Sequence, residues 1–286
     1  MSGQKIDLAL AFMLSQPGSA AAVLEQRPLD EVADFLTDLP HRQTAAVLKQ
    51  MLPHYIARLC NHLAPSTAAS FLSDMSIETV AAILRITEPQ VQQAILAVLP
   101  DKTRIQCHLL LSYPETAVGA WMQTRFACVP HDYSCDQALD YLASVLTANV
   151  PATEEEADHT PIIVIDRERR PIGSAAFGDL YRAPPEKLIN SILKTTPQIL
   201  SAQVSVKAAL DNAVWQQHEY VAVIGRDQKI VGLLRHLDLR RAMTLLAQTI
   251  EEPQGSDPVS GLVQVYGQTL FALFNTLWMV GESKQR

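Results

Sequence analysis

Carboxylates recur along one face of a predicted helix near the N-terminus. Asp30, Asp34 and Asp38 follow one another at intervals of four residues, and Glu31 lies beside the first of them. Like charges four residues apart on a helix repel by about 0.2–0.5 kcal/mol per pair, and a hard divalent cation such as Mg²⁺, which prefers oxygen ligands, would relieve that repulsion. A solvated acidic face opposite an apolar one has the same pattern. These four residues are therefore candidate Mg²⁺ ligands, and the solvated face remains the alternative.

Side chains for covalent or acid–base catalysis form no recognisable arrangement. The eight histidines are scattered, and His54, Cys60 and His62 do not have the spacing of a metal site. No glycine-rich phosphate loop precedes a predicted helix. The four cysteines include no Cys-x-x-Cys pair and indicate reduced thiols of a cytoplasmic protein rather than disulfides or zinc ligands. We therefore expect a protein that is not an enzyme.

Length and charge limit the remaining classes. A chain of 286 residues is long enough for two or three domains, each with its own core. The net charge of −7 argues against binding to nucleic acid, which needs a surplus of Lys and Arg on one face. The N-terminus has no signal-peptide pattern. The composition therefore favours a cytoplasmic protein that does not bind nucleic acid.

The first half of the chain consists of a repeat of short helices. Prolines recur at steps of 12, 13, 12, 24 and 11 residues, so that one mark is skipped near Ser76: Pro28, Pro40, Pro53, Pro65, Pro89 and Pro100. Proline suits the first turn of a helix, because its missing N–H would be unpaired there. Apolar residues lie at helical spacing between the prolines: Val32, Phe35, Leu36 and Leu39, then Ala68, Ala69, Phe71 and Leu72, then Val91, Ile95, Val98 and Leu99. Helices of about ten residues are marginal alone, so we expect them to stack into a superhelix.

The second half contains one α/β unit written twice. Residues 161–165 and 220–224 are short β-branched runs, and each is followed by a charged turn and a second strand. The second strands end in Gly173 to Asp179 and in Gly232 to Asp238, 59 residues apart. A predicted helix precedes each strand pair at an offset of 71 residues, so the first copy has 12 additional residues before its strand. The acidic segment 147–160 accounts for them and is predicted to be a solvated loop.

The strand, helix, strand, strand, helix order with a Gly-x-hydrophobic-x-x-x-Asp ending resembles the CBS module, which occurs in pairs. The stretch Tyr113 to Met122 (YPETAVGAWM) resembles the junction of the MgtE family of magnesium channels and transporters, in which Tyr-Pro, an acidic residue, Gly and Met recur at this spacing. The helical repeat also resembles that family's N-terminal cytosolic domain. The resemblance covers residues 20–248, and its junction motif is more specific than its repeat.

The resemblance implies a domain order and a function. The expected architecture is an MgtE-N-like helical superhelix over residues 1–122, CBS modules over 123–183 and 184–249, and a linker with a C-terminal amphipathic helix over 250–286. In the MgtE family this cytosolic region is a homodimeric sensor that binds Mg²⁺ through carboxylates between its domains and closes an attached pore. We therefore expect a homodimer through the CBS pair that senses Mg²⁺ and regulates a transporter or another partner. Asp30, Glu31, Asp34 and Asp38 would lie on the helical side of the interdomain interface.

CBS pairs often bind adenine nucleotides, which gives an alternative function. A Ser or Thr three residues before the final Asp donates to phosphate or ribose, and the Asp holds the ribose hydroxyls. Asp179 and Asp238 are present here, but Ala176 and Arg235 replace the hydroxyl residues, which weakens the expectation of nucleotide binding. Arg235 could instead contact a phosphate. A ligand-free interaction scaffold is the third possibility.

A charge-free segment follows the predicted CBS pair. Residues 261–281 are long enough to cross a bilayer, at about 20 residues. Polar Gln264, Gln268 and Asn275 recur along one side, which favours an amphipathic helix over a membrane span. Such a helix would pack on the protein, on a dimer mate or on the inner face of the membrane.

Overall fold

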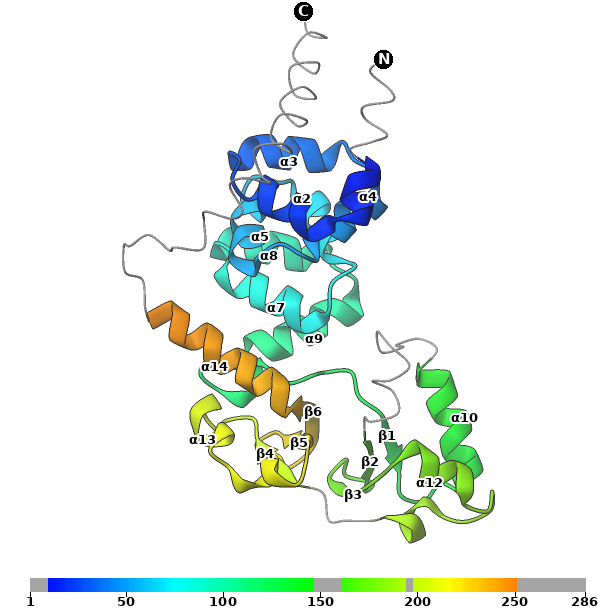
Figure 1. Ribbon diagram of the computed structural model, residues 1–286. Helices are drawn as coiled ribbons and strands as arrows, with labels where there is room; N and C mark the ends of the chain where they lie inside the picture. The colour runs from blue at the N-terminus through cyan, green and yellow to red at the C-terminus, as the bar shows by residue number, and fades with distance from the viewer. Residues whose placement is uncertain (1–9, 147–160, 194–197, 251–286) are drawn as a thin grey trace, which may run out of the picture. The chain divides into compact units, whose positions relative to one another are not determined.

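A computed structural model describes residues 10–146, 161–193 and 198–250 of the chain. The chain divides into two compact units with a boundary between Arg104 and Ile105. The first contains short helices and the second contains two small sheets with their own helices (Figure 1). The loop expected over residues 147–160 and the amphipathic helix expected over 261–281 lie outside the described residues.

The helical unit has the predicted proline-marked repeat. Pro53, Pro65 and Pro89 each stand in the first turn of a helix, and Pro28 and Pro40 each stand one residue before one. The described helices, the last of which crosses the unit boundary, are α2 (Pro17–Leu24), α3 (Leu29–Thr37), α4 (His41–Leu48), α5 (Pro53–Cys60), α6 (Pro65–Leu72), α7 (Ile77–Ile86), α8 (Pro89–Val98) and α9 (Asp101–Leu111). The prediction that each proline marks a helix start is confirmed.

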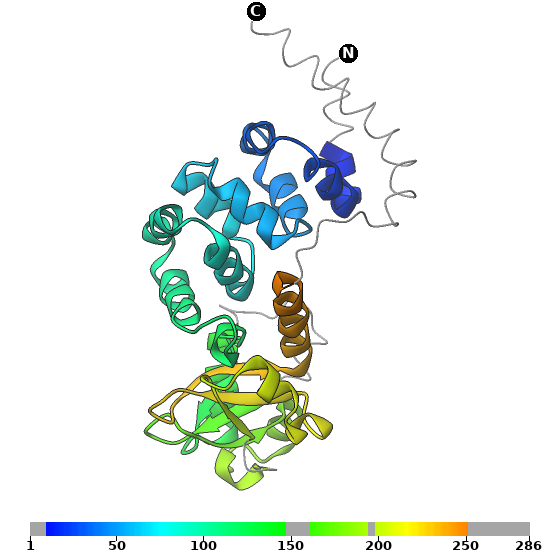
Figure 2. The same ribbon diagram turned by 90° about the vertical axis from the view of Figure 1, so that its left-hand side faces the viewer.

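Each helix of this unit packs on the next but one. Helix α5 lies between α3 and α7, while α4 lies between α2 and α6, and α6 also contacts α8. The successive helices follow one another along a stack in Figure 2. The apolar stripes meet inside this stack, where Leu36, Leu72 and Ile95 are buried. Val98 was expected in the same stripe but is 50% exposed, because it is the last residue of α8 and lies at the rim of the stack.

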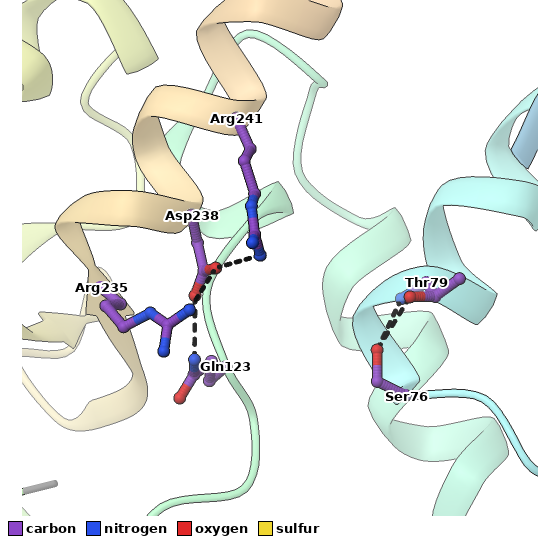
Figure 3. Close-up of polar contacts among 6 residues, drawn as sticks. All are labelled: Ser76, Thr79, Gln123, Arg235, Asp238 and Arg241. Carbon is purple, nitrogen blue, oxygen red and sulfur yellow. Dashed lines mark hydrogen bonds and ion pairs between the residues drawn. The ribbon is translucent and has the colours of Figure 1, made fainter. Parts of the chain in front are cut away.

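Helix α7 starts without a proline, and Ser76 takes over its role. The Ser76 hydroxyl oxygen accepts a hydrogen bond from the backbone N–H of Thr79 (3.2 Å) and lies 2.9 Å from the Thr79 hydroxyl (Figure 3). A serine N-cap satisfies one of the backbone donors left unpaired at a helix start. The mark skipped in the proline series is therefore a helix start of a second chemical kind.

Loss of this cap has a measurable consequence. Ser76→Ala is expected to lower the free energy of unfolding by about 1 kcal/mol, because the Thr79 N–H loses its partner. Ser70→Ala, on the exposed side of α6, is the matched control and is expected to change stability by less than about 0.5 kcal/mol. Urea unfolding of both variants measures the difference. Equal stabilities would contradict the capping role.

The second unit contains the strand, helix, strand, strand, helix order twice, which is the expected tandem CBS fold. In each three-stranded sheet the central strand runs parallel to the first and antiparallel to the third. The first copy contains β1 (Cys128–Pro130), α10 (Cys135–Leu146), β2 (Ile162–Ile165), β3 (Pro171–Ala175) and α12 (Phe177–Arg182), and the second contains β4 (Ile199–Ser201), α13 (Val206–Leu210), β5 (Tyr220–Ile224), β6 (Ile230–Arg235) and α14 (His236–Ile250). Short 3₁₀ helices lie at η1 (Val118–Ala120), η2 (Ile189–Ile192) and η3 (Ala213–Gln216).

The two copies repeat even their irregular backbone. Each charged turn has one non-glycine residue at positive φ, Arg169 at 65° and Gln228 at 62°. The pairing of the central strand with the third strand shifts after Val164 in the first copy and after Val223 in the second. Both pairs are 59 residues apart, as are the Gly and Asp positions of the endings. The internal repeat is therefore structural as well as sequential.

Strand β2 is apolar at every position because both of its faces are buried. Ile162 and Val164 face the helices of their own copy, where they pack with Leu142 and Leu180. The alternate residues Ile163 and Ile165 pack instead against β5 and β6 of the other copy. Alternate side chains of a strand point to opposite faces, so one strand serves two cores. The two copies thus share a core between their sheets.

Candidate functional site

The predicted acidic face is present on α3 and is exposed. The side chain of Asp30 is 83% exposed, and Asp34 and Asp38 are exposed as well. The opposite face of the helix is buried through Val32 and Leu36. The carboxylates therefore line the solvent side of a helix that the core holds in place.

The helix dipole treats these carboxylates differently. Asp30 and Glu31 lie in the first turn of α3, where a negative charge is favourable by about 0.3–1 kcal/mol. Asp38 is the C-cap residue, next to the exposed carbonyls of the last turn, where the same interaction is unfavourable. Helix stability thus accounts for the acidic residues at the start of α3, but not for Asp38.

Asp30 has a partner that sequence patterns did not indicate. His62, in the turn after α5, places Nδ1 2.5 Å from Asp30 Oδ1. Helices α3 and α5 pack together, so residues 32 positions apart in sequence become neighbours. The only available signal was the helical repeat, which brings alternate helices side by side. A cation that binds Asp30 therefore competes with this imidazole.

The α3 face supplies only part of a metal coordination shell. Among the residues that the structure describes, no group of three or more His, Cys, Asp or Glu side chains is arranged to hold a metal ion. Mg²⁺ commonly keeps several of its waters and takes one or two protein carboxylates. The α3 residues therefore fit a water-rich site, with further ligands from another surface.

The two Gly…Asp endings place their aspartates alike but surround them differently. Asp179 lies in the first turn of α12, with Oδ1 4.0 Å from the Arg182 guanidinium. Ala176 is the N-cap residue of α12 and makes no side-chain cap hydrogen bond. Asp238 lies in the first turn of α14, and its carboxylate is surrounded by donors. Of the three predicted nucleotide-site residues, the structure brings Arg235 and Asp238 together and leaves Asp179 in the other copy.

The donors around Asp238 come from three segments (Figure 3). Gln123 Nε2 donates to Asp238 Oδ2 at 2.9 Å. Asp238 Oδ1 lies 3.7 Å from the guanidinium of Arg235, at the end of β6, and 3.6 Å from that of Arg241, one turn along α14. The side chains of Arg235 and Asp238 are only 14% and 22% exposed. We name Gln123, Arg235, Asp238 and Arg241 the Asp238 cluster.

The junction motif packs against the second CBS copy. The N–H groups of Val118 and Gly119 donate to carbonyls of residues 204 and 202 at 2.8 and 2.9 Å. A Cβ on Gly119 would lie 2.5 Å from the Tyr113 ring, and one on Gly232 would lie 2.6 Å from Met122 Sδ. The Tyr, Gly and Met of the motif therefore each fill a place in this packing.

The cysteines are free thiols in apolar surroundings. Burial raises the pKa of Cys60 to about 12 and also raises the pKa values of Cys128 and Cys135 above their ordinary value. Nearby Arg169 and Lys187 oppose the last two shifts only in part. These three thiols are therefore protonated, and poorly nucleophilic, at neutral pH.

No helix among the described residues is both long and apolar enough to cross a membrane. This finding covers α2 to α14 and does not extend to the predicted helix at 261–281.

Comparison with known proteins gives concordant results for both halves. Residues 15–116 match the model of the MgtE intracellular N domain. The magnesium transporter MgtE of Bacillus subtilis (strain 168) is 19% identical over 233 residues, which are 81% of this chain and 47% of that protein. The chain thus spans about half the length of this curated relative.

Two solved structures have the same fold. The soluble part of a magnesium transporter matches 86% of this chain and 100% of its own, with a TM-score of 0.59 and 17% identity. The cytosolic domain of the Mg²⁺ channel MgtE in complex with ATP matches 77% of this chain and 92% of its own, with a TM-score of 0.54 and 19% identity. This chain therefore carries an MgtE intracellular N domain at residues 15–116, followed by a CBS pair, and resembles the cytosolic region of the MgtE magnesium transporters.

Proposed function

We propose that this chain is a non-enzymatic regulatory protein that senses Mg²⁺ and acts in magnesium transport. The observation that carries the proposal is the exposed acidic face of α3, which lies inside the stretch that matches the MgtE intracellular N domain. Asp34 and Asp38 are the central ligands in this proposal, and Asp30 and Glu31 flank them.

The physical mechanism is a cation-dependent docking of acidic surfaces. Carboxylates on one surface repel those on another until a divalent cation binds between them, so Mg²⁺ favours the docked arrangement and its loss favours the separated one. The position of Asp38 agrees with this role, because a bound cation would offset its unfavourable place at the C-terminal end of α3. Ordered waters would complete the coordination shell.

The proposed partner is a transporter on the cytoplasmic side of a membrane. Its support is the similarity to proteins described as a magnesium transporter and as its soluble part. We further propose that the CBS pair forms a homodimer, because CBS pairs of the MgtE family assemble in that way. Regulation of an attached or separate pore would then follow from Mg²⁺-dependent movement within the dimer.

Removal of two carboxylates tests the proposal. In the complete chain, millimolar Mg²⁺ is expected to slow backbone amide exchange over residues 30–38, because a docked and metal-bound helix opens less often. Asp34→Asn with Asp38→Asn is expected to weaken the Mg²⁺ dependence of this protection by about tenfold or more, because carboxylates are preferred Mg²⁺ ligands.

A matched control separates ligand loss from charge loss. Asp136 and Asp140 are exposed, also four residues apart, and lie on α10 of the first CBS copy. Asp136→Asn with Asp140→Asn removes the same charge and is expected to leave the Mg²⁺ response intact. An equal response from the two double variants would refute the assignment to α3.

A further inference from the structure

The Asp238 cluster joins three segments that are far apart in sequence. Gln123 belongs to the end of the junction, Arg235 to the last residue of β6 and Arg241 to α14. Backbone bonds hold the junction beside β6, because Gln123 N–H donates to Leu233 O at 2.7 Å and Leu233 N–H donates back at 2.9 Å. All three segments therefore converge on one carboxylate.

We propose that the Asp238 cluster is an internal clamp, which fastens the junction to the start of α14 without a bound nucleotide. The CBS resemblance assigns the final Asp to ribose hydroxyls and the residue three before it to a hydroxyl donor. In this chain Arg235 takes the donor position and directs its guanidinium toward Asp238 instead. Both oxygens of the carboxylate are thus engaged by the protein's own side chains.

Burial makes this arrangement strong enough to replace a ligand contact. Exposed ion pairs contribute little because water and salt screen them. The Arg235 and Asp238 side chains are mostly covered, so their attraction is screened less, and hydrogen bonds to charged groups are stronger than neutral ones. A nucleotide that used Asp238 would have to displace these contacts.

The first CBS copy supplies an internal comparison. Ala176 stands where Arg235 stands in the second copy, and Asp179 forms its ion pair with Arg182, whose side chain is 83% exposed. Gln123 pairs with β6 of the second copy. The clamp is therefore a property of the second copy, although both copies retain the aspartate.

The consequence is a fixed mechanical connection. Residues 116–123 follow α9, the last helix of the helical array, and α14 leads out of the CBS pair toward the C-terminal segment. Because both are fastened to the second copy, a displacement of the junction is transmitted to α14. This inference does not depend on Mg²⁺ binding.

Amide hydrogen exchange on the complete chain, without Mg²⁺, tests the clamp. Asp238→Ala is expected to accelerate exchange in residues 118–124 and 236–241 by roughly tenfold or more, since a charged acceptor of several donors is lost. Asp179→Ala, at the equivalent position of the first copy, is expected to leave both segments unchanged. Should Asp238→Ala fail to fold, Gln123→Ala removes only the uncharged donor and is expected to accelerate exchange in the junction several-fold.

The nucleotide arm uses ATP, ADP and AMP with the wild-type chain. The clamp predicts that none of them alters exchange in residues 118–124 or 236–241. Protection of α14 by any of these nucleotides, or exchange unaffected by Asp238→Ala and Gln123→Ala, would overturn the proposal. Because Mg²⁺ is absent throughout, neither result bears on the proposed Mg²⁺ function.

Discussion

Gly232→Ala is expected to destabilise the CBS pair by about 1–3 kcal/mol, since the added methyl group has no space. A Cβ at this position would lie 2.6 and 2.7 Å from Sδ and Cγ of Met122 and 3.0 Å from the backbone oxygen of Gln123. Met122 is fully buried, so its side chain cannot move aside into solvent. The loss of unfolded-state entropy that favours alanine over glycine, about 0.4–1 kcal/mol, is too small to offset this overlap. Thermal or urea unfolding of the complete chain measures the effect.

Two further variants make the prediction specific. A Cβ on Gly178, which lies inside α12, would have no neighbouring atom closer than 3.9 Å, so Gly178→Ala is expected to stabilise the chain by about 0.4–1 kcal/mol. Met122→Ala opens space beside Gly232, so the double variant Met122→Ala with Gly232→Ala should lose less stability than the sum of its single variants. Additive losses would contradict the proposed contact.

Ile83→Ala is expected to lower the stability of the helical unit by about 2–5 kcal/mol, because a buried isoleucine leaves a cavity that its neighbours fill only in part. Ile83 is fully buried on α7, in the layer that α7 forms with α5. Units of stacked short helices depend on such contacts, because each helix alone is marginal. Hydrogen exchange of α5 and α7 is expected to report the loss.

The same helix provides the control. Ile86, three residues later, is 55% exposed, so Ile86→Ala is expected to change stability by less than about 1 kcal/mol. The two variants share residue type, helix and substitution and differ in burial. Similar losses in both would show that the stripe does not face a core.

Local patterns accounted for most of the fold. Proline positions marked the helix starts, and strands β2 and β5 lie within one residue of the predicted runs at 161–165 and 220–224. The 59-residue repeat predicted the matching Gly…Asp endings. These features depend on residues close together in sequence, where steric preference and periodicity act directly. Val98 departs from its stripe because a helix end can leave the core without breaking the periodicity.

The candidate sites depended on contacts over long sequence distances. Gln123 and Asp238 are 115 residues apart, and His62 and Asp30 are 32 apart. Nothing in the local pattern around Gln123 distinguishes it from a surface glutamine. Arg235 was predicted to weaken nucleotide binding, but only the fold indicates that its guanidinium lies beside Asp238.

Calorimetric titration of the complete chain with Mg²⁺ tests the central claim most directly. We expect saturable binding to the wild-type chain and to the Asp136→Asn, Asp140→Asn variant. We also expect binding weakened by about tenfold or more in the Asp34→Asn, Asp38→Asn variant. Absence of Mg²⁺ binding to the wild-type chain, or equal affinity in both double variants, would contradict the proposed Mg²⁺ site on α3.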